Sequence, residues 1–431
     1  MEDYQTTRIV DRDELGGVSL PGEVQLALDD LAGSVREGLL ALSVGVGLKV
    51  MEELLEDELL ALVGPKGKHD PERTALRHGS RSGQVVLGGR KLQVRRARAR
   101  TLDGGELRLR AYAHFASDDL LGERTLETML ARLSTRRHRA CLEPTGTEDR
   151  SVSKSAVSRR FVERTRRSLA ELMARPAPED LVCLMLDGVV LASHTCLVAL
   201  GIRADGTKIP LGIWEGASEN AAVCRRALAD LLERGLSAEQ GLLVCIDGSK
   251  ALRKAVVDAL GEKAAIQRCR RHKQENVLSH LPEAERPWVR RKLREAWAQE
   301  RAELAERRLR ELAGALDHKR PGAAASVREG LAETLTITRL GVTPGSALGR
   351  TLASTNPIES MLSICRERAR NVKRWRGGEM ALRWTAAGML DAEKSFRRVK
   401  GFRELPKLQA ALRRHAADVD RKEVEDFATA A

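Results

Sequence analysis

The sequence is poor in aromatic residues and lacks long apolar runs, paired cysteines and a glycine-rich phosphate loop. Aromatics make up only 3% of the 431 residues, so the core must rely on Leu, Val, Ala and Ile. No apolar run approaches the ~20 residues of a membrane span, and the acidic N-terminus lacks a signal peptide, so we expect no membrane association. Without a glycine-rich loop, an ATP-driven motor is unsupported.

The cysteines are scattered and form no Cys-x-x-Cys pair. There are seven of them, and two lie in apolar runs that are typical of strands. This usage favours reduced thiols in a cytoplasm over a disulfide framework. We therefore expect a cytoplasmic protein.

Positive charge exceeds negative charge in this sequence, and it is unevenly spread along the chain. The net charge is +13, although residues 1–62 hold fourteen acidic and only four basic residues. Residues 73–110 hold eleven Lys/Arg against two acids, and residues 132–167 hold eleven against four. Within the first block, residues 85–94 predict a small basic hairpin. Such blocks fit a polyanion, most simply nucleic acid, although a solvated arginine-rich surface is the alternative.

Two apolar runs end on the dipeptide Asp-Gly. Residues 184–186 run into Asp187, and residues 243–246 run into Asp247. Each run predicts a buried strand with a carboxylate at its C-terminal end and a glycine turn behind it. In open α/β sheets, ligands bind at this edge. We therefore expect the two carboxylates to lie close together.

A third acid, Glu359, lies at the start of a predicted helix. Three carboxylates from two strands and one helix can hold two divalent ions, and their hard oxygens suit Mg²⁺, with Mn²⁺ as an alternative. Two ions about 3.5–4 Å apart serve the attacking and leaving oxygens of a phosphodiester. We expect Asp187 to bind both ions, and Asp247 and Glu359 to complete one site each. Taken singly, an Asp at a strand end is more often a turn residue.

Three further side chains are candidates for contacts near this site. Arg366 lies two helical turns after Glu359 and would contact a phosphate; a surface charge pair is the alternative. Cys269 and His272 supply only two of the four ligands that a structural zinc ion needs. We interpret them as polar groups near the active site that contact DNA.

The order of predicted elements indicates an α/β core. Strands are predicted at 182–187, 195–202, 208–214 and 242–247, with a helix after the third and another after the fourth. This order matches a ribonuclease-H-like core and not a doubly wound sheet. We predict the following divisions: 1–62, an acidic helical module; 63–175, a mostly helical, basic DNA-binding region; 181–280, the first part of the core; 281–350, an all-helical insertion; 351–400, the last part of the core; 401–431, a tail.

A helix at 153–167 is the candidate DNA reader. Ser153 is suited to cap it, and its exposed polar face would carry Lys154, Ser155, Ser158 and Arg159. Such a face suits the recognition helix of a helix-turn-helix, which lies in the major groove. A plain surface helix is the alternative.

Several stretches together resemble a known family. They are SVSKSAVSRRF (151–161), LDGV (186–189), KIPLGIWEG (208–216), DGSKAL (247–252), QRCRRH (267–272) and STNPIES (354–360). In combination, over roughly residues 75–400, the chain resembles the bacterial insertion-sequence transposases of the Mutator type. The resemblance implies a DDE transposase on a ribonuclease-H-like fold, with a helical insertion before the glutamate.

The resemblance also implies roles for individual residues. The triad falls on Asp187, Asp247 and Glu359, the Cys-x-x-His element on Cys269 and His272, and the basic residue after the glutamate on Arg366. The implied activity is magnesium-dependent cleavage at terminal inverted repeats, followed by strand transfer into target DNA. The implied partner is double-stranded DNA, bound by a homodimer or higher multimer on the bacterial nucleoid.

Two rival functions remain open. A resolvase-like nuclease with the same fold would hydrolyse DNA without joining strands. A non-catalytic DNA-binding regulator would need none of the three carboxylates.

Overall fold

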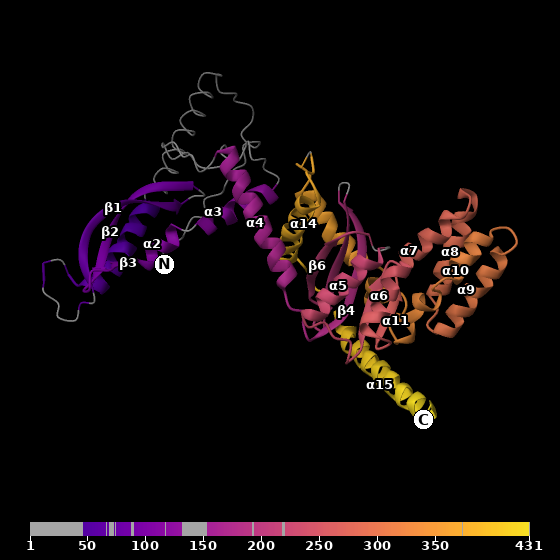
Figure 1. Cartoon of the computed structure of the whole chain (residues 1–431). Helices are drawn as coiled ribbons and strands as arrows, with labels where there is room; N and C mark the ends of the chain where they lie inside the picture. The colour runs from indigo at the N-terminus through magenta and orange to yellow at the C-terminus, as the bar shows by residue number, and fades with distance from the viewer. Residues whose placement is uncertain are drawn as a thin grey trace, which may run out of the picture. The chain divides into compact units, whose positions relative to one another are not determined.

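The computed structural model describes residues 46–65, 67–68, 73, 75–87, 90–116, 118–131, 153–191, 194–217, 220–372 and 374–430 (Figure 1). The chain divides into two compact units, one of residues 1–125 with 134–159 and one of residues 126–133 with 160–431. Both helices and sheets are present, so the predicted α/β class is confirmed at that level. Within the described residues, no helix has the length and apolarity to cross a lipid bilayer.

The first unit contains an antiparallel sheet in the order β1-β2-β3. Its strands are β1 (Ala75–Leu87), β2 (Arg90–Thr101) and β3 (Glu106–Leu107). Val85, Leu92 and Val94 share a buried cluster with Met51 and Leu59 of the helix over residues 46–63. The predicted hairpin is therefore present, and its strands extend well beyond residues 85–94.

The helices α2 (Arg110–Phe115), α3 (Asp118–Leu130) and α4 (Lys154–Ala174) follow the sheet along the chain. Ser153 caps α4 as predicted, because its hydroxyl accepts a hydrogen bond from the backbone N–H of Ala156 at 3.3 Å. Residues 132–152 lie outside the described part of the chain, so the helix-turn-helix stays a prediction.

The second unit contains a five-stranded sheet in the order β6-β5-β4-β7-β8. β4 pairs antiparallel with β5, which pairs antiparallel with β6, whereas β4, β7 and β8 run parallel. The strands are β4 (Leu181–Leu191), β5 (His194–Arg203), β6 (Lys208–Glu215), β7 (Leu242–Ile246) and β8 (Ala264–Arg268).

Helices cover both faces of this sheet because successive strand residues alternate between them. Leu184 and Leu186 of β4 pack with α5 (Ala221–Glu233) and α6 (Lys250–Leu260). Cys183 and Met185 face the other layer. That layer contains α12 (Ala347–Leu352), α13 (Asn356–Arg368), α14 (Gly378–Glu393) and α15 (Leu405–Ala430), with a short 3₁₀ helix at Phe402–Glu404.

Residues 281–350 form helices and connecting turns only, as their charged helical pattern predicts. With α7, which precedes them, they build a separate apolar cluster from residues such as Leu293, Leu309 and Val327. The helices are α7 (Arg270–Ser279), α8 (Arg286–Trp297), α9 (Ala302–Leu316), α10 (Pro321–Arg328) and α11 (Thr336–Arg339), with 3₁₀ helices at Glu283–Glu285 and Ala332–Leu335.

Two strand predictions were wrong in detail. β4 does not turn after Asp187 but continues to Leu191, because residues 187–191 keep pairing with β5 beyond the end of β7. β8 was missed because its five residues include the polar pair Gln267-Arg268, although both side chains are buried. Tertiary contacts therefore stabilise β8 as a strand, although its sequence pattern does not predict one.

Candidate active site

Asp187 and Asp247 emerge side by side at one edge of the sheet. The parallel pairing of β4 with β7 ends at Leu186 and Ile246, and each Asp is the next residue along its chain. Cys183 and Met185 of β4 face the layer that contains α13. Because strand side chains alternate, Asp187, two residues after Met185, points to the same layer.

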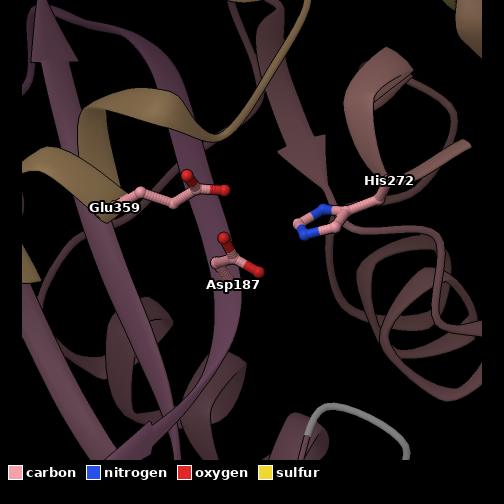
Figure 2. A group of neighbouring side chains, drawn as sticks. All are labelled: Asp187, His272 and Glu359. Atoms are coloured by element: carbon pink, nitrogen blue, oxygen red, sulfur yellow. The ribbon is translucent and has the colours of Figure 1, made fainter. Parts of the chain in front are cut away.

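Glu359 reaches Asp187 from α13. Asn356 begins this helix, Pro357 occupies its first turn, and Glu359 follows in that turn, as predicted. Oxygen atoms of Asp187 and Glu359 and a ring nitrogen of His272 all lie within 4.8 Å of one another. Figure 2 shows both carboxylates and the imidazole converging from β4, α13 and α7. These three residues could hold a metal ion.

The Asp187 carboxylate is nearly buried, and its surroundings set its proton affinity. Burial raises its pKa from 3.8 to about 6, and the nearby charges of Asp247 and Glu359 act in the same direction. A hydrogen bond from the Thr355 hydroxyl and the proximity of His272 oppose this rise. Thr355, which is fully buried, is a site residue that we did not predict. Its place in the STNPIES stretch was the available signal.

Cys269 and His272 act as a unit beside the carboxylates. A hydrogen bond with Cys269, together with the charges of Asp187 and Asp247, raises the pKa of His272 to about 9, against the effect of burial. A protonated imidazole donates hydrogen bonds and is not a metal ligand. In the absence of a metal, His272 is therefore a cation that faces Asp187.

Cys269 is not placed to touch DNA. Its side chain has no exposed surface, and its Sγ lies 3.8 Å from the Thr355 hydroxyl. Its backbone N–H donates to the carbonyl of Ile246 at 2.8 Å, which joins the start of α7 to the end of β7. The prediction that the Cys269 side chain contacts DNA is therefore wrong, because protein atoms enclose it completely.

Asp247 lies beside the group of three but outside it. Its Oδ1 accepts a hydrogen bond from the backbone N–H of Ser249 at 2.8 Å, which closes a turn over Gly248. Gly248 has a φ of +107°, and a Cβ at that position would collide with Nε of Arg268. The predicted glycine turn is therefore confirmed at Asp247, and it packs directly on a buried guanidinium.

Two buried cations, which we did not predict, join this edge of the sheet to the helices that follow. Arg268 is 3% exposed, and its Nη1 donates to the carbonyl of Glu329 at 2.9 Å. Lys273 is 2% exposed, and its ammonium donates to the carbonyls of Ser326 and Glu329 at the end of α10. Burial lowers the pKa of Lys273 to about 7. Cations at a helix C-terminus interact favourably with its unpaired carbonyls.

Arg271 contacts Glu359 directly. Its guanidinium forms an ion pair with the Glu359 carboxylate and also donates to Asn356 Oδ1 at 3.3 Å. The Arg271 side chain is 50% exposed, so solvent screens the pair. No sequence pattern distinguished this arginine from its neighbours.

The remaining predicted DNA contacts lie on the surface. Lys154, Ser155, Ser158 and Arg159 are all exposed on the first two turns of α4, while Val157 is buried. Arg366 is exposed in the last turn of α13. Exposure is compatible with DNA contact and does not by itself establish it.

Comparison with known proteins shows the family to which the chain belongs. The family described as "Transposase, Mutator family" matches residues 29–399. The transposase for insertion sequence element ISRM5 of Rhizobium meliloti (strain 1021) is 28% identical over 361 residues, which cover 80% of this chain and 86% of that protein. The transposase for insertion sequence element IS1081 of Mycobacterium tuberculosis (strain ATCC 25618 / H37Rv) is 28% identical over 335 residues, 73% of this chain and 79% of its own. The chain therefore belongs to the Mutator family of insertion-sequence transposases.

Proposed function

We propose that this transposase cuts DNA at the ends of its element and joins the freed 3′ ends to target DNA, through three carboxylates on a ribonuclease-H-like core. The observation that carries the proposal is the strand order β6-β5-β4-β7-β8, with Asp187 and Asp247 leaving adjacent parallel strands. Glu359 approaches Asp187 from a helix after the helical segment 281–350. A helical segment between the second and third carboxylates supports the proposed core.

Asp187 and Glu359 are the residues that would hold a divalent ion, and Asp247 would complete a second position. Their donor set fits a hard cation, because carboxylate oxygens suit Mg²⁺ and Mn²⁺. Bound Mg²⁺ would lower the pKa of the attacking water or 3′-hydroxyl and stabilise the leaving 3′-oxygen. Asp247 would have to turn from its bond with Ser249 or share one oxygen with it.

The other side chains of the site orient these carboxylates. The Thr355 hydroxyl holds the Asp187 carboxylate and favours its ionised form. His272, protonated beside Asp187, is positioned to donate a hydrogen bond to a phosphate oxygen. Arg268 supports the turn that presents Asp247.

The first two turns of α4 and the basic sheet β1-β2-β3 would bind the terminal inverted repeats. α4 would read base edges through Ser155, Ser158 and Arg159, with Lys154 on the phosphate backbone. The cutting of two ends and their joining to target DNA would require a homodimer or higher multimer. This activity would take place on nucleoid DNA in the bacterial cytoplasm.

A cleavage assay on duplexes that contain the element's end tests the proposal. Asp187→Asn, Asp247→Asn and Glu359→Gln should each lower the Mg²⁺-dependent cleavage rate by at least about 1000-fold, because each removes a charge that the transition state needs. Glu311→Gln, an exposed acid on α9, is the control and should keep near-normal activity. If the three variants cleave like the control, the proposed site is wrong.

A second assay separates the proposal from its two rivals. Precut ends are incubated with a supercoiled target and Mg²⁺, and joined product is measured. Hydrolysis without joined product would favour a resolvase-like nuclease. DNA binding without cleavage, in the full chain and all variants alike, would favour a non-catalytic regulator.

A further inference from the structure

The segment that follows the end of α13 carries a dense positive charge. Residues 366–376, named here the arginine segment, hold six Lys/Arg and a single acid. Arg366, Arg370, Arg374 and Arg376 are all exposed, and none has an ion-pair or hydrogen-bond partner among the described residues. By contrast, Arg368 pairs with Asp391 at 3.1 Å.

A helix dipole explains only part of this charge. Cations in the last turn of a helix are stabilised by its unpaired carbonyls, which accounts for Arg366 and Arg368. The effect decays within that turn, and α13 ends at Arg368. The helix dipole therefore does not stabilise the arginines beyond that turn, which are Arg370, Arg374 and Arg376. Four mutually repelling guanidinium groups in eleven residues suit a polyanion.

Aromatic packing anchors the segment at Trp375. Trp375 is half-buried, and its ring meets that of Trp384 edge to face with centroids 6.4 Å apart. Trp384 in turn packs against Phe161 at 4.5 Å. Because Trp375 points inward, Arg374 and Arg376 on either side of it are exposed. Arg374 and Arg376 therefore flank an anchored side chain.

The next acid along the chain is already neutralised. Glu379 follows the segment at the start of α14, and its carboxylate accepts a hydrogen bond from Arg166 at 2.9 Å. Arg383 also lies 3.3 Å from the same carboxylate. Glu379 is therefore unavailable to neutralise Arg374 or Arg376.

We propose that the arginine segment binds the phosphate backbone of duplex DNA whose scissile phosphate lies at Asp187 and Glu359. The inference rests on the proposed function and deepens it by naming a sequence-independent DNA surface. Its connection to the site is α13, which carries Glu359 in its first turn and leads into the segment at its other end. From Glu359 to the end of α13 at Arg368 the helix rises ~14 Å, or about four base pairs of duplex. Phosphate contacts at that distance would orient the duplex without reading its sequence.

Salt-dependent binding to a duplex of unrelated sequence tests the proposal in the full-length protein. The triple variant Arg370→Gln/Arg374→Gln/Arg376→Gln should lower affinity and reduce the slope of log affinity against log salt by about 2 to 3, since each lost phosphate contact accounts for about 0.9. Fluorescence anisotropy of labelled DNA over a range of KCl measures this slope. Thermal melting followed by circular dichroism should match the unsubstituted protein.

The matched control removes the same charge elsewhere. Arg294→Gln/Arg307→Gln/Arg308→Gln changes three exposed arginines of α8 and α9 that also lack partners among the described residues. Its slope should stay within about 1 of the unsubstituted protein. An unchanged slope in the segment variant, or an equal fall in the control, would overturn the inference.

The cleavage assay on the same preparations keeps the two proposals apart. If the unsubstituted protein cuts DNA at the element's ends while the segment variant keeps its salt slope, only the arginine segment is wrongly assigned. If the unsubstituted protein neither binds nor cuts DNA, the proposed function itself fails.

Discussion

Arg271 and Glu359 form an ion pair at the centre of the candidate active site. Arg271 comes from α7 and Glu359 from α13, so the pair joins two helices that are distant in sequence. The same carboxylate lies within 4.8 Å of donor atoms of Asp187 and His272. The guanidinium therefore competes with any metal ion for the oxygens of Glu359.

Removal of this competitor should tighten metal binding. We expect Arg271→Gln to increase Mn²⁺ affinity about 1.5- to 5-fold, because an exposed ion pair is worth about 0.2–1 kcal/mol. Titration calorimetry with the DNA-free protein measures the affinity. Arg291→Gln, on the exposed face of α8, is the control and should change nothing. Weaker binding by Arg271→Gln would show that the arginine supports the metal site.

The raised pKa of Asp187 should make stability depend on pH in metal-free protein. Burial raises this pKa from 3.8 to about 6 in the folded chain, so folding favours the protonated form. Its stabilising contribution is therefore complete below pH ~4 and is lost as the pH rises through about 6. The amide side chain of Asp187→Asn does not ionise, so this variant should not lose stability in this way. As the pH rises from 4 to 7, the free energy of unfolding of Asp187→Asn should therefore rise by up to about 3 kcal/mol relative to that of the unsubstituted protein.

Urea denaturation in the presence of a chelator measures that difference. Asp258→Asn, an exposed acid on α6, serves as the control. Parallel stability profiles for Asp187→Asn and the unsubstituted protein would mean that Asp187 is not protonated on folding.

The close packing of Gly248 on Arg268 predicts a local effect on Asp247. Gly248→Ala should destabilise the fold by about 2–4 kcal/mol and abolish most cleavage, because φ is +107° and the new methyl group would displace a buried guanidinium. Gly261→Ala, at φ +65° with no atom within 4 Å of its added Cβ, should cost only the backbone strain of about 1–2 kcal/mol. Equal losses in the two variants would argue against the role of Arg268.

The exposed face of α4 predicts different effects for two of its cations. If Arg159 reads a base edge, Arg159→Ala should lower the preference for the element's end over unrelated DNA by about 1–3 kcal/mol. Lys154→Ala should weaken binding to both sequences by a similar factor, as expected for a phosphate contact. Competition binding with the two duplexes measures both effects. If Arg159→Ala keeps the same preference for the element's end, α4 is a surface helix that does not read DNA sequence.

The strand positions of the second unit could largely be predicted from the sequence. Apolar runs before Asp187 and Asp247 contain buried side chains on both faces, and that pattern identifies central strands. Ser153 and Pro357 marked the starts of α4 and α13 through local capping and backbone preferences. Local chemistry of this kind acts over a few residues, which is why it can be read directly.

The partners of the carboxylates could not be predicted in the same way. These partners are polar residues, and their residue type alone predicts that they lie on the surface. They are Thr355, Arg268, Arg271 and Lys273. Three of them are buried because the fold supplies carbonyl, carboxylate or thiol partners from segments more than fifty residues away.

The sequence by itself determined which acids the sheet would present, because strand, glycine turn and helix start are local properties of the chain. Only the tertiary structure decided how those acids are surrounded. It extended β4 beyond Asp187, turned Asp247 toward Ser249, and brought His272 and Arg271 to the carboxylates. The physical reason is that burial and the charges of distant segments set the environment of each carboxylate, and both depend on how the whole chain packs.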